Sequence, residues 1–271
     1  MDGIERGFFE VINPYNQYRR HVPARPHDVH SIVFWSKNFG PFLRGGFDRK
    51  LHQKGYRLFF NFTINAPSLE LEPHVPPLAE RLRQITELSQ RHDPEAITWR
   101  FDPICFFRRN GSTKLHHNLD ALEPIADAMA NVGIRRCVTS FVDLYRKIQH
   151  RLPATGLELV DPSADVKGHT LLTMAATLRP RQISLGTCCE QAVLDTLPPD
   201  TGITTGDCIP GPLLASLFGD DFALKKDPGQ RQTRGCTCNM ATDIGSYRQQ
   251  PCYHNCLFCY ANPQDPARRP V

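Results

Sequence analysis

Long apolar runs are absent from this sequence, and so is any segment dominated by charge of one sign. No uninterrupted apolar stretch approaches the ~18 residues that a membrane-spanning helix needs. The opening residues, MDGIERGFFEV, have neither the apolar core nor the cleavage site of a secretory signal peptide. We therefore expect a cytoplasmic protein with no membrane partner.

A basic segment is also missing. The formal net charge is +4, and the 32 Lys and Arg residues are spread along the chain. This balance suits an anionic small-molecule substrate. It gives no case for a nucleic-acid partner, because proteins that bind nucleic acid usually gather their basic residues into a patch or stripe.

Apolar runs rich in β-branched and aromatic residues recur through the first two-thirds of the chain, with segments of helical spacing between them. The strand-like runs are 31–38, 56–65, 96–104, 135–143 and 181–188, with a weaker one at 7–13. The helical segments are 38–53, 75–92, 118–132 and 163–178. Such alternation predicts parallel βαβ units. About six strands are too few for a closed eight-stranded barrel, so we predict an α/β fold of the partial (β/α)6 TIM-like barrel type.

The composition changes near residue 188. Residues 188–271 are rich in Pro, Gly, Asp and Thr, and the only helical stretch expected among them is GPLLASLFG. A segment of this kind buries little apolar surface, and a metal centre is an effective way to order its loops. We predict a partial barrel over 1–187 and a loop-rich, cysteine-rich iron–sulfur region over 188–271 that packs on it.

Polar side chains stand where the predicted strands end. Arg100 and Asp102 are two residues apart, so a strand places both on one face. Lys37 and Asn38 end another strand. Because active sites of parallel α/β proteins lie beyond the carboxyl ends of the strands, we take Arg100, Asp102 and Lys37 as candidate catalytic residues and Asn38 as a cofactor contact. The alternative for each is an N-cap or ion pair that holds a strand end. Arg100 and Lys37 suit a phosphate or carboxylate on the substrate.

The chain has 10 cysteines, and all but two of them fall between residues 188 and 259. In a reducing compartment, clustered thiols are more often metal ligands or redox groups than disulfides. Cys105 and Cys137 stand alone in apolar runs, and we expect them to be buried and inert. The metal chemistry is therefore expected in the C-terminal third.

The densest set is Cys252, Cys256 and Cys259, spaced C-x3-C-x2-C in PCYHNCLFCY. Three thiolates can hold three irons of a [4Fe–4S] cube and leave the fourth iron open to a small molecule. A zinc site is the alternative, because zinc closes with four ligands and C-x2-C pairs are common among them. His254 would then be a further candidate ligand.

The segment CYHNCLFC resembles the cluster loop of radical S-adenosylmethionine (radical SAM) enzymes, including the aromatic Phe258 before the last cysteine. The resemblance implies that Cys252, Cys256 and Cys259 hold a [4Fe–4S] cluster whose open iron chelates S-adenosylmethionine. It also implies reductive cleavage to a 5′-deoxyadenosyl radical, with the electron supplied by a flavodoxin- or ferredoxin-like reductant. That radical takes a hydrogen atom from a small-molecule substrate, which we expect to be anionic or nucleotide-like. A partial (β/α)6 barrel is typical of the superfamily.

The same resemblance extends to the residues after the last cysteine. Tyr260 would pack near the adenine, and Asn262 would donate a hydrogen bond to the methionine or ribose of the cofactor. The alternative is that this stretch merely turns the chain away through Pro263.

Nearly the whole chain resembles an uncharacterised bacterial and archaeal family with a C-terminal cysteine cluster of this kind. The segments that carry the resemblance are VINPYN, IVFWSKN, YRLFFNFTIN, VPPLAER, TWRFDPI, CVTSFVDLY, GDCIPGPLLASLFG and CLFCYANP. In most radical SAM enzymes the cluster loop follows the first strand, whereas here it lies near the end of the printed sequence. Family members usually carry another strand-like segment before the point where this sequence starts. We therefore expect the first barrel strand to be missing or replaced by another segment.

A second set of thiols precedes the triple. Cys188, Cys208, Cys236 and Cys238 come from Gly-flanked loops, and Cys189 is left as a spare because adjacent residues rarely bind one iron site. This set predicts an auxiliary [4Fe–4S] cluster that relays electrons, anchors substrate or gives up sulfur. A zinc site or separate reduced thiols are the alternative. For the whole protein, the alternatives are a zinc-stabilised binding module without catalysis and an iron–sulfur electron carrier.

Overall fold

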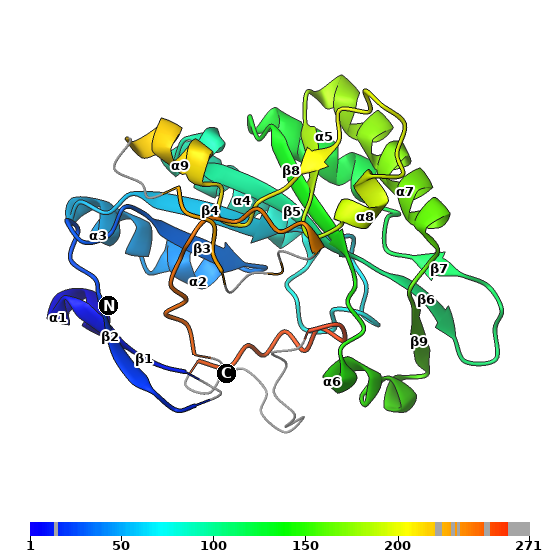
Figure 1. Ribbon diagram of the computed structural model, residues 1–271, viewed down its shortest axis with the longest axis horizontal. Coiled ribbons are helices and arrows are strands. Elements are labelled where there is room, and N and C mark those ends of the chain that lie inside the picture. Colours follow the sequence, from blue (N-terminus) through cyan, green and yellow to red (C-terminus); the bar gives the residue numbers. More distant parts are fainter. Residues whose placement is uncertain (14–15, 220–223, 229–230, 232–233, 247–249, 260–271) are drawn as a thin grey trace.

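The computed structural model describes residues 1–13, 16–219, 224–228, 231, 234–246 and 250–259 (Figure 1). Tyr260 and Asn262, named above as cofactor contacts, lie outside the described residues. Among the residues that are described, no helix is both long and apolar enough to cross a membrane.

The centre of the fold is a six-stranded parallel sheet in the order β11-β10-β8-β5-β4-β3. Its strands are β3 (Ile32–Ser36), β4 (Leu58–Thr63), β5 (Ile97–Ile104), β8 (Arg136–Phe141), β10 (Ser184–Thr187) and β11 (Thr204–Thr205). Each strand lies beside the next one of this series along the chain, so the order never reverses. The prediction of a parallel α/β fold is confirmed.

Five helices connect or flank these strands: α2 (Gly40–Arg44), α3 (Phe47–Gln53), α4 (Leu78–Arg91), α5 (Leu122–Asn131) and α7 (Ala164–Leu178). The last three correspond to the predicted helical segments. The first segment, predicted as one helix over 38–53, is instead two short helices. The break falls at Gly46, whose φ of 58° is in the left-handed region that glycine adopts at little cost.

The two faces of the sheet differ in chemistry because side chains alternate along each strand. One face carries Phe60, Trp99, Cys137 and Leu185, which pack with residues of the five helices into the main hydrophobic core. Most neighbouring positions on the other face toward the carboxyl ends are polar or small, with Val138 as the exception, and Arg100 lies in the middle of them. They are Asn61, Thr63, Thr98, Arg100, Val138, Ser140 and Gly186.

The predicted strand at 7–13 exists, but not in the parallel sheet. It is β1 (Phe8–Ile12), which pairs antiparallel with β2 (Arg19–Pro23) in a separate hairpin. This hairpin follows α1 (Asp2–Arg6) in the sequence. The short connection favours this local pairing over a distant partner. The sixth parallel strand is β11, a two-residue strand that the sequence pattern did not indicate.

A second small sheet, in the order β7-β6-β9, extends the opposite end of the molecule from the β1–β2 hairpin (Figure 1). It consists of β6 (Phe106–Arg109), β7 (His116–His117) and β9 (Leu157–Val160), and α6 (Arg146–Gln149) precedes β9. β6 follows β5 after one residue, so this sheet lies near the carboxyl ends of the parallel strands.

The cysteine-rich region contributes to the fold as well as to loops. Its helix α9 (Gly211–Phe218), which confirms the predicted GPLLASLFG helix, packs Leu214 against Phe59 of β4 and Ala96 before β5. Phe59 lies on the polar face of the sheet near the amino ends of the strands. α9 therefore covers the amino end of that face and leaves its carboxyl end to the cysteine loops. The one-turn α8 (Gln191–Leu194) follows β10.

The lone cysteines Cys105 and Cys137 are fully buried, as expected. Burial raises the pKa of both thiols, that of Cys137 to about 12, and Cys105 lies near Glu72 and Cys256. Neither lies in the second thiol set, so Cys137 offers a control for experiments on the candidate ligands.

The buried His92 should make the protein sensitive to acid. Burial lowers its pKa to about 4, whereas the histidine of an unfolded chain titrates at about 6.5. Between these values the unfolded chain binds a proton that the folded chain does not, so stability falls as the pH falls through this window. His92→Gln cannot take up that proton. Its unfolding free energy, measured with urea from about pH 7 to about pH 4, should fall less steeply than that of the unsubstituted protein. Equal slopes would contradict this assignment, and the exposed His169→Gln is the matched control.

Candidate active site

A buried guanidinium lies at the centre of the polar face. Arg100 is 1% exposed, and its Nη2 lies 2.8 Å from Asp102 Oδ2, so the two predicted residues form an ion pair. Ser140 donates to the other carboxylate oxygen of Asp102. Arg100 Nη1 donates to Cys208 Sγ at 3.4 Å, and its guanidinium lies 4.6 Å from the ring centre of Trp35. Arg100 thus joins the carboxyl end of β5 to one of the predicted metal ligands.

A second buried ion pair adjoins the first. Lys37 Nζ lies 2.7 Å from Glu72 Oε1 and donates to the carbonyl oxygen of Asp102 at 3.3 Å. Burial alone would lower the pKa of Lys37, but the Glu72 carboxylate holds it above its ordinary value. Asn65 donates to both Glu72 and the Asp102 carbonyl and accepts from the Asp102 backbone N–H. All three predicted catalytic residues therefore lie together.

The triple-cysteine loop lies over this polar group. The backbone N–H of Leu257 donates to the carbonyl of Leu71, in the loop after β4, at 2.8 Å. Lys37, just after β3, lies 5.3 Å from the ring centre of Phe258. Arg151, which follows α6, donates to the carbonyl of Cys259. The loop is thus held at the carboxyl ends of the parallel strands, where α/β proteins place their chemistry.

The three thiols of this loop lie near one another. Cys256 is buried, while Cys252 and Cys259 are half-buried. The Cys259 N–H donates to the Cys256 carbonyl at 3.0 Å, which closes one turn around the C-x2-C pair. Burial raises the pKa of Cys256 to about 12; nearby Lys37 lowers it, while Glu72 and the thiols of Cys259 and Cys252 raise it further. The loop therefore presents three neighbouring thiols beside a buried ammonium.

The second thiol set assembles where β10 and β11 end. Cys188, Cys189, Cys236 and Cys238 are buried against Val138, with Cys208 and Ile209 at the margin. The Sγ–Sγ distances are 3.6 Å from Cys188 to Cys208 and 3.7 Å from Cys188 to Cys189, and Cys238 Sγ accepts from the Cys208 N–H at 3.2 Å. All four predicted ligands and the spare Cys189 are therefore in one cluster.

Glycines let this set approach the sheet. A Cβ on Gly206 would stand 2.7 Å from Val138 Cγ1, and one on Gly186 would stand 2.9 Å from the Gly206 Cα. Only glycine fits at such a distance, so the segment before Cys208 lies directly on β8 and β10. Asn61 of β4 then donates to the Cys208 carbonyl at 3.0 Å.

The thiols of this set differ in acidity. Hydrogen bonds from Cys189 and Cys208 hold the pKa of Cys188 far below its ordinary value, and Arg100 adds to the effect. Contact with the Cys208 side chain and hydrogen bonds from the backbone N–H groups of Ile209 and Cys208 lower the pKa of Cys238 to about 6. The same contacts raise the pKa of Cys208. Two members of the set are thus stabilised as thiolates, the form that binds metals.

The cysteine thiols of the second set are suitable ligands for a metal ion or an iron–sulfur cluster. Their sulfur atoms, however, do not surround a common centre. Within the described part of the chain, no three His, Cys, Asp or Glu side chains are grouped so that they could hold a metal ion. The close sulfur contacts form a row from Cys189 through Cys188 to Cys208. Binding would therefore require rotation of these side chains about a backbone that already brings them together.

The remaining predicted and unpredicted residues have distinct places. Asn38 Oδ1 accepts from the backbone N–H of Gly40, the first residue of α2, and from Nε2 of Gln84 in α4. Its role as a cofactor contact stays a prediction. Two functional candidates were missed. Glu72 lies in a loop, and no sequence motif surrounds it. Trp35 lies in an apolar strand-like run, which predicts a core residue, but the residue is 50% exposed.

Comparison with known proteins gives one match. The family model described as "Domain of unknown function (DUF1848)" covers residues 1–261. The chain belongs to this DUF1848 family. The resemblance to an uncharacterised family over nearly the whole chain is thereby confirmed, and the match includes both thiol sets. No curated protein and no solved structure matches the chain. No activity is assigned to the DUF1848 family by its description, so the radical SAM assignment stays a prediction.

Substitutions of Lys37 and Glu72 should have non-additive effects on the free energy of unfolding, because the two side chains form an ion pair. Lys37→Met removes the cation of the Glu72 carboxylate, whose side chain is 3% exposed and whose Oε2 has no hydrogen-bond partner among the described residues. Removing one member of a buried pair typically costs about 3 kcal/mol or more, because the other charge remains in a medium that solvates it poorly. Urea unfolding should show this loss for Lys37→Met and a partial recovery for Lys37→Met/Glu72→Gln. A double variant no more stable than the single one would contradict the coupling.

Proposed function

We propose that this protein is a radical SAM enzyme. In this proposal Cys252, Cys256 and Cys259 hold a [4Fe–4S] cluster, and S-adenosylmethionine binds beside it. When bound, such a cluster supplies one electron to the sulfonium of the cofactor, which releases a 5′-deoxyadenosyl radical able to take a hydrogen atom from a substrate. The observation that carries the proposal is the position of the C-x3-C-x2-C loop over the carboxyl ends of β3, β4 and β5.

The fold is compatible with this activity. A sheet of six parallel strands whose order never reverses has the connectivity that a partial (β/α)6 barrel requires. The apolar face, covered by helices, would be the outside of the barrel, and the polar face would be its interior. We assign residues 1–187 to the barrel and 188–271 to a cluster-bearing region, with β11 as the segment that adds the last strand.

Three residues have proposed roles that follow from their contacts. Lys37 places a buried ammonium beside Cys256 and over the ring of Phe258, where it favours an anionic group such as a cofactor carboxylate. Asp102 orients the Arg100 guanidinium through its carboxylate and holds Lys37 through its carbonyl. Arg100 in turn holds Cys208. These contacts connect both thiol sets to one polar group.

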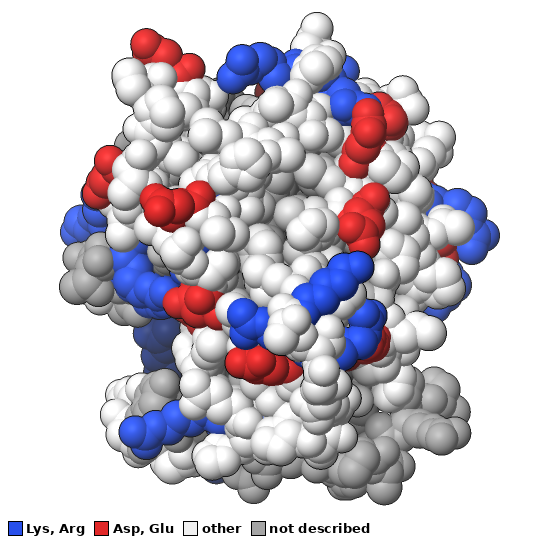
Figure 2. Space-filling model, turned by 90° about the vertical axis from the view of Figure 1, so that its right-hand side faces the viewer, with Lys and Arg blue, Asp and Glu red and all other residues white. Residues whose placement is uncertain are grey.

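The substrate in this proposal is a small molecule, and the electron comes from a flavodoxin- or ferredoxin-like protein in the cytoplasm. A nucleic-acid substrate receives no support from charge. On the face shown in Figure 2, Lys and Arg side chains are interspersed with Asp and Glu rather than collected into a basic stripe. Tyr260 and Asn262 remain candidate cofactor contacts by resemblance alone.

The second thiol set supports an auxiliary [4Fe–4S] cluster, with a zinc site as the second candidate. One observation favours zinc. Tetrahedral Zn–S bonds of about 2.3 Å place the sulfurs about 3.8 Å apart, close to the 3.6 Å between Cys188 and Cys208 Sγ. A four-iron cube holds its thiolates further apart because an iron stands in front of each. To hold a cluster, the sulfur atoms would have to move further apart. To hold zinc, the side chains would need only to rotate at about their present separation.

Substitution of the triple should abolish cofactor cleavage. Cys256→Ala removes one of three thiolates, so the loop should no longer hold a cluster, and S-adenosylmethionine cleavage by the reduced, anaerobically prepared protein should fall at least a hundredfold. Cys137→Ala also removes a buried thiol but touches neither set, and it should retain cleavage. Release of 5′-deoxyadenosine, followed by chromatography, measures both. Undiminished cleavage by Cys256→Ala would refute the proposal.

The second set is tested by metal content. Cys238→Ala should lower the iron content by about four per chain if the set holds a cluster, or lower the zinc content by about one if it holds zinc. Cys189→Ala should leave either content unchanged. The reverse pattern, in which Cys189→Ala loses the metal and Cys238→Ala keeps it, would show that the ligands are wrongly assigned.

A further inference from the structure

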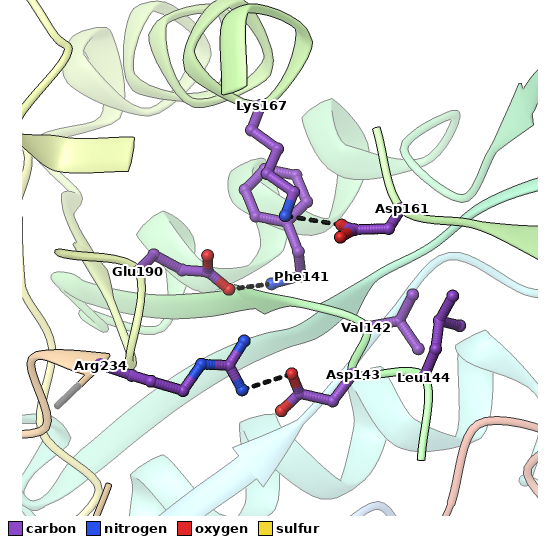
Figure 3. A pocket seen from close by; sticks show the side chains of 8 residues that line it. All are labelled: Phe141, Val142, Asp143, Leu144, Asp161, Lys167, Glu190 and Arg234. Carbon is purple, nitrogen blue, oxygen red and sulfur yellow. Dashed lines mark hydrogen bonds and ion pairs between the residues drawn. The ribbon is translucent and has the colours of Figure 1, made fainter. Parts of the chain in front are cut away.

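The charged side chains around the small pocket at the carboxyl end of β8 satisfy one another (Figure 3). Lys167 Nζ lies 2.6 Å from Asp161 Oδ1, and Arg234 Nη1 lies 2.6 Å from Asp143 Oδ1. Both cations are therefore committed to carboxylates of the protein itself. Trp35, on the first strand of the parallel sheet, has a different environment.

Trp35 is an unusual residue for its place in the sheet. β3 is an edge strand, and Trp35 lies opposite Asn61 of β4 in the parallel register, on the polar face. The residue is 50% exposed, although an indole gains more free energy from burial than most side chains do. An aromatic side chain left half open among polar neighbours is typical of a surface that a ligand completes.

One side of the Trp35 ring is occupied. The guanidinium of Arg100 lies over the ring, 4.6 Å from its centre. Arg100 is itself 1% exposed and is held by Asp102 Oδ2 at 2.8 Å and by Cys208 Sγ at 3.4 Å. Because the guanidinium covers one side of the indole, the exposed area belongs to the opposite side and to the edges. The ring is thus held in place with one π-face accessible.

The accessible face lies between two covered positions. Val33, two residues before Trp35, packs with Leu214 of α9. Lys37, two residues after it, lies 5.3 Å from the ring centre of Phe258 in the triple-cysteine loop. Four residues of extended chain span at most about 13 Å. The space between the two covers therefore fits a small planar ring system and is too narrow for a protein surface.

A buried acceptor lies beside the ring. Asn61 is 0% exposed, and its Nδ2 donates to the Cys208 carbonyl at 3.0 Å. Its Oδ1 has no hydrogen-bond partner among the described residues. A buried acceptor without a donor costs free energy. A planar ring that carries N–H groups at its edge suits these surroundings better than a hydrocarbon ring does.

We propose that the open side of Trp35 stacks a nucleobase of the small-molecule substrate. Every nucleobase has a π-face, so stacking on an aromatic side chain is tolerant of the identity of the base. Arg100 on the other side of the indole adds a cation–π contact that fixes the platform.

The base belongs to the substrate because of where the platform is anchored. Trp35 is tied through Arg100 to Cys208 of the second thiol set. The adenine of the cofactor is expected elsewhere, beside Tyr260. This assignment to the substrate rests on the proposed function, whereas the stacking itself needs neither cluster nor cofactor.

The test is a titration of the full chain with adenosine at neutral pH. The chain has two tryptophans, and Trp99 is fully buried, so a stacked base should quench the fluorescence of Trp35. We expect saturable quenching by adenosine. Ribose, which lacks the base, and benzyl alcohol, which has a π-face but no N–H, should bind at least tenfold more weakly. The proposal is overturned if adenosine does not bind, or if either probe binds as tightly.

Variants followed by calorimetry locate the binding. Trp35→Ala removes the platform and should weaken adenosine binding at least tenfold. Trp35→Phe keeps a smaller π-face and should bind with intermediate affinity. Tyr18→Ala removes another aromatic side chain, 67% exposed and distant in sequence, and should bind as the unsubstituted protein does. Undiminished binding by Trp35→Ala would place the base elsewhere and refute the proposal.

A competition experiment separates the substrate from the cofactor. In anaerobically prepared protein, saturating S-adenosylmethionine should leave the affinity for adenosine unchanged. Displacement of adenosine would assign the platform to the cofactor and overturn the inference. None of these titrations measures S-adenosylmethionine cleavage, so a failure here leaves the proposed function untouched.

Discussion

The Arg100 guanidinium is the interaction on which the rest of the site depends. A fixed positive charge at 1% exposure must be surrounded by acceptors, and the chain supplies Asp102 within the same strand and Cys208 from the far end of the sheet. Asp102 in turn is fixed by Asn65 and Ser140. One buried charge therefore orders the ends of β4, β5 and β8 and the loop after β11.

The two thiol sets are arranged around this group. Cys208 contacts Arg100 directly, and Cys256 is close enough to Lys37 for the ammonium to lower the pKa of the thiol. The C-terminal region has little apolar surface of its own beyond α9. It is anchored instead by backbone hydrogen bonds, such as that from Leu257 to Leu71, and by glycines that allow a close approach to the sheet. Metal binding would add the stabilisation that a small core does not.

Much of the fold could be predicted because local pattern and tertiary environment agree. The helix at 75–92 buries Ile85 and Leu88 on its apolar stripe, and the strand at 96–104 alternates Trp99 and Phe101 with Arg100 and Asp102. The parallel sheet follows from that alternation. The hairpin at 7–13 and the two-residue β11 could not be predicted, because periodicity does not identify the partner of a strand.

The candidate site shows the same division. Arg100, Asp102 and Lys37 could be placed at strand ends because charged residues next to buried strands are unusual. Glu72 could not, because a single acidic residue in a loop acquires its role only when the fold brings Lys37 to it.

The most direct test of the central claim is iron, sulfide and zinc analysis of anaerobically purified protein, combined with electron paramagnetic resonance of the reduced form with and without S-adenosylmethionine. The radical SAM assignment predicts at least about four irons per chain and a signal that shifts when the cofactor is added. With an auxiliary cluster the content would be about eight. Zinc without iron would contradict the assignment. So would an iron signal that is unchanged when S-adenosylmethionine is added.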